Sequence, residues 1–123
     1  MISAKMRVKV SKIEQLTPTI KQFELSPIIG ELPPFTAGSH IRFHLTSLDL
    51  IKAYSLINAP HETSTYQVAV LLCEDSQGGS KFMHHSLAEG DEIEISPPEN
   101  FFPLVEDKSK KHLFIAGGIG ITP

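Results

Sequence analysis

Lys52-Ala53-Tyr54-Ser55-Leu56 is the stretch around which the rest of this chain is organised. Its neighbouring positions supply a cation, a flat ring and a hydroxyl. The turn Gly78-Gly79-Ser80 follows further along, where the start of a helix presents backbone N–H groups to an anion. Together these parts meet the needs of a planar aromatic ligand that carries a phosphate.

Alternating apolar and polar residues surround that stretch, and this period of two is typical of half-buried strands. Ile41, Phe43 and Leu45, for example, face one side of a predicted strand, and the polar residues between them face the other. The pattern predicts six strands, over Met6–Ser11, Ile20–Leu25, His40–Leu45, Lys52–Ile57, Tyr66–Cys73 and Asp91–Ser96. A continuously apolar run predicts a seventh strand over His112–Ala116.

One segment has the period of a helix instead. From Ser80 onward, Phe82, Met83 and Leu87 fall at helical spacing. Ser80 is a favourable N-cap and Gly90 suits the left-handed residue that ends a helix, so we expect one helix of about two turns. Short strands with one helix between the fifth and the sixth predict an all-β fold, a six-stranded antiparallel Greek-key β-barrel.

Composition is typical of a globular domain. The 123 residues, 41% of them hydrophobic, amount to one domain. The formal net charge of -3 does not favour nucleic acid as a partner. No apolar run approaches the roughly 20 residues that span a bilayer, and no signal peptide is recognisable, so we expect a cytoplasmic protein without a membrane partner. Cys73 is alone, and one thiolate is no ligand set for zinc or an iron–sulfur cluster.

Five segments of the sequence together resemble one protein family. They are Gly38-Ser39-His40, Lys52-Ala53-Tyr54-Ser55, Gly78-Gly79-Ser80, the run from Glu94 to Leu104, and Gly117-Gly118-Ile119-Gly120-Ile121-Thr122-Pro123. Their order and spacing are similar to those of the ferredoxin reductase-type FAD/FMN-binding domains. The resemblance is strongest to the N-terminal part of reductase components of Rieske-type oxygenases, of the phthalate dioxygenase and vanillate O-demethylase kind. Lys52 stands where that family has the arginine of an Arg-x-Tyr-Ser motif.

The resemblance implies a flavin site, with FMN favoured over FAD. The residues that would hold the flavin are Lys52, Ala53, Tyr54, Ser55, Gly78, Gly79, Ser80 and Thr122. In the family, the tyrosine ring lies against the flavin ring and the serine hydroxyl lies near flavin N5. Lys52 would contact the flavin phosphate with looser geometry than arginine, because an ammonium is a point charge and a guanidinium is a planar fork. No residue is predicted to be catalytic or to bind a metal.

The resemblance also implies parts that lie outside this chain. Residues 1–112 would form the flavin-binding domain, and residues 113–123 would be the first strand and glycine turn of an NAD-binding domain. Electrons would pass from NAD(P)H through the flavin to a ferredoxin-like 2Fe-2S domain or protein, so this chain alone would be an incomplete oxidoreductase. Residues 119–123 are expected to be exposed, because the parallel sheet that would bury them is missing.

Plainer interpretations stay open. Tyr54 fits a half-buried packing ring, Lys52 a solvated strand lysine, and Gly78-Gly79-Ser80 an ordinary helix start. The whole chain fits a small β-barrel binding or interaction module without flavin, because fold does not fix function. A metal site is not favoured, since four strand residues separate His40 and His44 by about 13 Å, whereas metal–ligand bonds are about 2 Å long. A Ser-His-Asp hydrolase is not favoured either, because no nucleophile elbow is present.

Overall fold

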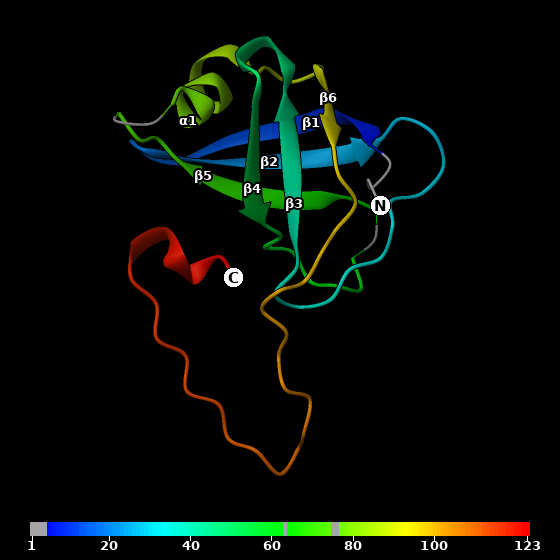
Figure 1. Ribbon diagram of the computed structural model, residues 1–123, viewed down its shortest axis with the longest axis vertical. Coiled ribbons are helices and arrows are strands. Elements are labelled where there is room, and N and C mark those ends of the chain that lie inside the picture. Colours follow the sequence, from blue (N-terminus) through cyan, green and yellow to red (C-terminus); the bar gives the residue numbers. More distant parts are fainter. Residues whose placement is uncertain (1–4, 63, 75–76) are drawn as a thin grey trace.

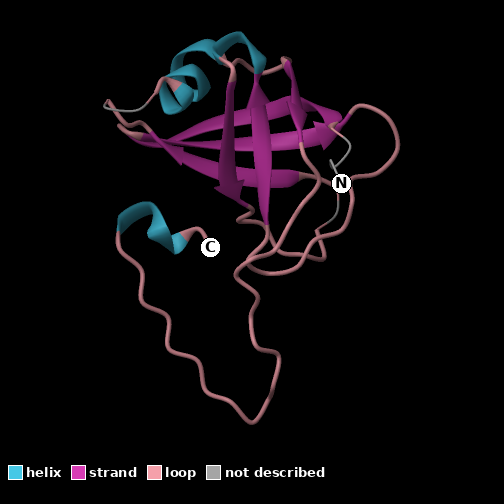
Figure 2. Cartoon of the chain, in the orientation of Figure 1, coloured by secondary structure: helices cyan, strands magenta, loops and turns pink. Residues whose placement is uncertain are grey.

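Six antiparallel strands form one sheet that rolls into a barrel in the computed structural model (Figure 1). The structure describes residues 5–62, 64–74 and 77–123. The elements are β1 (Met6–Thr17), β2 (Ile20–Pro27), β3 (His40–Leu45), η1 (Thr46–Leu48), β4 (Leu50–Ser55), β5 (Tyr66–Leu71), α1 (Gly79–Lys81), η2 (Phe82–Ser86), β6 (Glu92–Ile95) and η3 (Gly118–Ile121). Helical turns lie at one end of the barrel and near the C-terminus (Figure 2).

The strand order in the sheet is β4-β3-β6-β1-β2-β5. Two hairpins, β1 with β2 and β3 with β4, are joined through β6, which pairs with both β1 and β3. This order leaves β4 and β5 at the two edges of the sheet, and the barrel closes where these edges approach each other. Just beyond β4, the N–H of Ile57 donates to the carbonyl of Gln67 at 2.9 Å, so the seam is hydrogen-bonded at that end. The predicted six-stranded antiparallel fold is confirmed.

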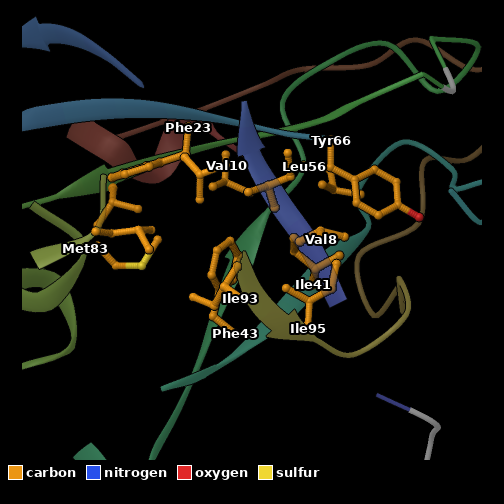
Figure 3. Packing of buried hydrophobic residues seen from close by; sticks show 14 of the residues in the cluster. Val8, Val10, Phe23, Ile41, Phe43, Leu56, Tyr66, Met83, Ile93 and Ile95 are labelled. Atoms are coloured by element: carbon orange, nitrogen blue, oxygen red, sulfur yellow. The ribbon is translucent and has the colours of Figure 1, made fainter. Parts of the chain in front are cut away.

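The inward faces of the strands form one apolar core (Figure 3). Ile41, Phe43 and Leu45 are buried on β3, as the alternation predicted. Every second residue of β5 from Tyr66 onward is also buried. Phe35, from the loop before β3, packs edge to face against Tyr66 with ring centroids 5.7 Å apart. Burying each large apolar side chain contributes about 1.5–3 kcal/mol, and a shift of one residue would turn the whole set outward, so this face fixes the strand register.

The predicted strand over His112–Ala116 is wrong. These residues run as a loop and pair with no strand in the part of the chain that the structure describes. Leu113, Phe114 and Ile115 are 86%, 74% and 89% exposed. A strand is held by hydrogen bonds to a neighbouring strand, and an apolar run alone does not supply one. The other six predicted strands form, with ends that differ by at most two residues, except that β1 runs on from Ser11 to Thr17.

The predicted helix is also partly wrong, because it begins earlier and ends sooner. Gly78, in the left-handed region with φ of +106°, is the N-cap, and Ser80 lies inside the first turn. The Ser80 hydroxyl is not available for capping, since it is hydrogen-bonded to the backbone of Cys73. α1 continues as the π-helical turn η2, and the chain is extended again at Leu87, before Gly90. Among the described residues, no helix has the length and apolar character to cross a membrane.

Because Tyr66 is buried, the fold should lose stability at alkaline pH. Its side chain is fully buried, its hydroxyl donates to the carbonyl of Pro33, and burial raises its pKa to about 12. An exposed phenol in the unfolded chain ionises near pH 10, so the free energy of unfolding should fall as the pH rises from 10 to 12. Urea titrations at about pH 8 and about pH 11 should show a smaller fall for Tyr66→Phe than for the wild type. Equal falls in the two proteins would contradict this assignment.

Candidate functional site

A cavity of about 300 Å³ opens at the seam between β4 and β5, which we call the seam cavity. Its lining residues are Lys52, Ala53, Tyr54 and Ser55 from β4, Ala69 and Leu71 from β5, Cys73, Ser80, and Ile119 and Thr122 from the C-terminal turn. Both faces of β4 reach the seam cavity because β4 is an edge strand. Six of the predicted site residues therefore come together here. Gly78 and Gly79 do not line the seam cavity.

The Lys52 side chain lies against the backbone of Gly79. A Cβ added to Gly79 would lie 2.9 Å from Cγ and 2.9 Å from Cε of Lys52, so only glycine leaves room for the lysine stem. The stem thereby runs beside the first residue of α1. None of the ion pairs among the described residues involves Lys52. Lys52 therefore brings to the seam cavity a positive charge that no described carboxylate neutralises.

The Tyr54 ring is both a packing ring and a wall of the seam cavity. It contacts Phe43 of the core edge to face, with ring centroids 5.6 Å apart and an interplanar angle of 84°. Burial, followed by a charge interaction with Cys73, raises the pKa of the Tyr54 phenol. The ring is therefore neutral near pH 7, and the core beneath it fixes its orientation.

Ser80 fixes the chain that leaves β5 to the start of α1. Its hydroxyl accepts a hydrogen bond from the Cys73 N–H at 2.9 Å and donates to the Cys73 carbonyl at 3.3 Å. These two bonds hold the exposed Cys73 on the wall of the seam cavity, beside Lys52 and Tyr54.

A second cavity, of about 390 Å³, meets the seam cavity at Ala53 and Ser55. Its other lining residues are Gly38, His40, Phe101, Phe102 and Pro123. The rings of His40 and Phe101 lie on one wall, with centroids 5.4 Å apart. β4 therefore borders two adjoining cavities, one lined by Lys52 and Tyr54 and the other by His40, Phe101 and Phe102.

The C-terminal turn borders both cavities. After leaving the barrel, residues 97–117 run outward and return to place η3 near β5 (Figure 1). Ile119 and Thr122 are half-buried and line the seam cavity, whereas Ile121 is 69% exposed. The expectation that residues 119–123 are all exposed is therefore only partly correct, because the turn packs against its own barrel.

Four lining residues of the seam cavity were not predicted to belong to the site: Ala69, Leu71, Cys73 and Ile119. They come from segments that approach β4 only once the barrel has closed. Ala69 carries a usable signal, since a small residue between Val68 and Val70 in a strand leaves space beside it.

Two of the six histidine rings make hydrogen bonds within the barrel. His84 Nε2 lies 2.7 Å from the Val70 carbonyl, and His44 Nε2 lies 2.7 Å from the Ser96 hydroxyl. Across residues 5–62, 64–74 and 77–123, no three His, Cys, Asp or Glu side chains are grouped as metal ligands.

Comparison with known proteins identifies clear relatives, although no protein-family model matches the chain. The carnitine monooxygenase reductase subunit of Escherichia coli (strain K12) is 50% identical over 119 residues, which cover 94% of this chain and 37% of that protein. The vanillate O-demethylase oxidoreductase of Acinetobacter baylyi is 46% identical over 119 residues, which cover 96% of this chain and 37% of that protein.

The structure of phthalate dioxygenase reductase matches with a TM-score of 0.88 and 37% identity, over 97% of this chain and 37% of that one. This chain spans a little over a third of the length of these relatives. It is therefore a homologue of the reductase components of oxygenase systems, with the ferredoxin reductase FAD-binding-domain-like fold of phthalate dioxygenase reductase.

Proposed function

We propose that this chain is the flavin-binding module of an NAD(P)H-dependent oxidoreductase, the reductase component of a Rieske-type oxygenase. The observation that carries the proposal is the seam cavity, which Lys52, Tyr54 and Ser55 line together. A bound flavin supplies the chemistry that links a two-electron nicotinamide donor to a one-electron acceptor. The adjoining cavities, of about 300 and 390 Å³, fall within the range of roughly 300–1,000 Å³ that is usual for small-ligand sites.

Each predicted site residue has a role in this proposal. Lys52 binds the flavin phosphate, and the turn Gly78-Gly79-Ser80, of which Ser80 lines the seam cavity, lies beside the phosphate. Tyr54 supplies an aromatic wall, which contributes about 0.5–1.5 kcal/mol beyond the burial of area. The hydroxyls of Ser55 and Thr122 and the small side chain of Ala53 border the place for the ring system. None of these residues needs to form a covalent bond with substrate, so their role is to bind and orient the flavin.

FMN is the cofactor we favour, with FAD as the alternative. Lys52 is the one lysine or arginine among the described lining residues of the two cavities, which suits a single phosphate better than a diphosphate. The resemblance of the sequence motifs implies the same choice.

The nicotinamide-binding domain and the iron–sulfur acceptor would lie beyond this chain. Phthalate dioxygenase reductase is described as modular, with electron transfer from pyridine nucleotides to a 2Fe-2S centre. By analogy, we assign residues 1–112 to the flavin-binding domain and residues 113–123 to the start of an NAD-binding domain, in which residues 113–116, a loop in this structure, would pair as the first strand before the glycine turn. The exposed apolar stretch Leu113–Ile115 supports this division, because a parallel sheet would bury it. We expect the module to act in the cytoplasm, where NAD(P)H is available.

Gly79→Ala tests whether the packing of the Lys52 stem against Gly79 contributes to phosphate binding. The new methyl group would displace the Lys52 stem. The φ of Gly79 is not positive, so the backbone accommodates alanine there without strain. We expect the fold to persist and FMN binding to weaken about threefold to tenfold, with riboflavin affected less than about twofold. Titrations that follow quenching of flavin fluorescence measure both constants. Equal weakening of both ligands would show that the Lys52 stem does not serve the phosphate.

Cys73 offers a direct test of where the flavin binds. It is the only cysteine in the sequence, it is exposed, and it lines the seam cavity. Saturating FMN should slow its reaction with a thiol reagent such as dithiobis(nitrobenzoate) by about tenfold or more, because bound ligand excludes the reagent. The double variant Cys73→Ser/Ser109→Cys is the control, since Ser109 lies in the exposed loop beyond the barrel.

The control thiol should react at the same rate with and without FMN. Unchanged reactivity of Cys73 at saturating FMN would contradict the seam cavity as the flavin site. Failure to bind FMN at all would favour the flavin-free β-barrel interaction module.

A further inference from the structure

The π-helical turn η2 is attached to the β2–β5 pair by two hydrogen bonds from one residue. His84 is 4% exposed, and its Nε2 lies 2.7 Å from the Val70 carbonyl. A carbonyl only accepts, so Nε2 carries the proton and donates. The backbone carbonyl of His84 in turn accepts a hydrogen bond of 2.6 Å from Lys21 Nζ.

Lys21 and Val70 are themselves partners across the β2–β5 ladder. The two groups that hold His84 therefore come from one cross-strand pair. The Lys21 ammonium also lies beside the last turn of the helical segment, because it donates to the His84 carbonyl there. Carbonyls at the end of a helix, which have no intrahelical partners, favour a cation.

We propose that Lys21 and His84 are positioning residues for the flavin phosphate, acting through α1 on Lys52. This inference rests on the proposed function. α1 continues into η2 without a break, so an anchor on His84 holds the whole segment from Gly79 to Ser86 against the barrel. At its other end, Gly79 forms the surface on which the Lys52 stem lies.

Two sets of hydrogen bonds, which we call anchors, hold this short segment, one at its start and one at its end. The Ser80–Cys73 hydrogen bonds hold its start to the chain leaving β5, and the Lys21–His84–Val70 bonds hold its end to the ladder. Met83, in the middle of the segment, is also buried in the core, so losing the bonds of Lys21 and His84 would loosen the segment rather than free it, and the Gly79 backbone would shift relative to β4. The Lys52 ammonium would then lose its preferred position, while the Tyr54 wall, which is fixed by Phe43, would remain.

The test compares FMN with riboflavin in variants of the two residues. Lys21→Met and His84→Leu remove one hydrogen bond each, whereas Lys21→Arg and His84→Gln keep a donor. Lys12→Met on β1 is the matched control, since it removes the same charge from an exposed strand lysine. The dissociation constants for both ligands are measured by flavin fluorescence, and the thermal midpoint of each variant checks that it is folded.

We expect Lys21→Met and His84→Leu to weaken FMN binding about tenfold and riboflavin binding less than about twofold. Lys21→Arg, His84→Gln and Lys12→Met should stay within about threefold of the wild type for FMN. If the wild type prefers FMN but Lys21→Met and His84→Leu leave that preference unchanged, the positioning role is overturned. If the wild type itself binds FMN and riboflavin equally, the phosphate site fails, and this inference fails with it.

Discussion

Replacing Lys52 with alanine is expected to weaken FMN binding about tenfold to a hundredfold, because a charge-assisted contact contributes about 1.5–3 kcal/mol. The seam cavity offers no second described cation that could take over the phosphate. Riboflavin lacks the phosphate, so its affinity for the wild type and for Lys52→Ala should be nearly equal. Titrations with both ligands, followed by quenching of flavin fluorescence, measure the two effects separately.

Three further variants check the assignment of Lys52. Lys52→Arg should tighten FMN binding, since a planar guanidinium matches a phosphate better than an ammonium does. Tyr54→Ala should weaken FMN and riboflavin alike, because contact with the ring system does not involve the phosphate. Lys12→Met, which removes an exposed charge on β1, should leave both affinities unchanged. If Lys52→Ala bound FMN as tightly as the wild type, Lys52 would be a solvated strand lysine.

Replacing Gly38 with alanine should destabilise the barrel by about 3 kcal/mol or more. Gly38 has a φ of +97°, and a Cβ there would overlap the carbonyl oxygen of Phe102. That carbonyl belongs to a segment held by Asn100, which donates to Thr36 Oγ1 at 2.7 Å and to the Ala37 carbonyl at 2.9 Å. The backbone cannot withdraw without breaking these bonds. The midpoint of urea unfolding measures the loss.

Gly30→Ala is the matched control for Gly38→Ala. Gly30 also has a positive φ, of +71°, but nothing lies within 4 Å of a Cβ added there. It should therefore show only the backbone cost of a left-handed alanine, about 1 kcal/mol. Equal losses in the two variants would mean that the close approach of Phe102 contributes nothing to stability.

Much of this fold is predictable from sequence because alternation is a local property. The period of two in residues 40–45 places the three apolar side chains inward whichever strand lies beside them. The predicted start of the helix at Ser80 failed for a non-local reason, since the Ser80 hydroxyl is committed to Cys73 across the turn. The strand predicted over His112–Ala116 failed similarly, because apolar character does not provide a partner for its backbone.

The candidate site shows the same division between local and distant information. Lys52 to Ser55 are consecutive, so a sequence motif is enough to identify them. Ala69, Leu71 and Cys73 belong to the opposite edge of the sheet, and only the closure of the barrel brings them to β4. The contact between Gly79 and the Lys52 stem depends on that closure too, which is why the sequence indicated a shared phosphate but not the packing that supports it.

The most direct test of the central proposal is the absorption spectrum of the purified chain after incubation with FMN and desalting. The seam cavity should retain about one FMN per chain, with flavin absorption bands that persist after gel filtration and are lost in urea with the folded barrel. A colourless protein after desalting, with a circular dichroism spectrum that still shows the folded β-barrel, would contradict the assignment of this chain as a flavin-binding module.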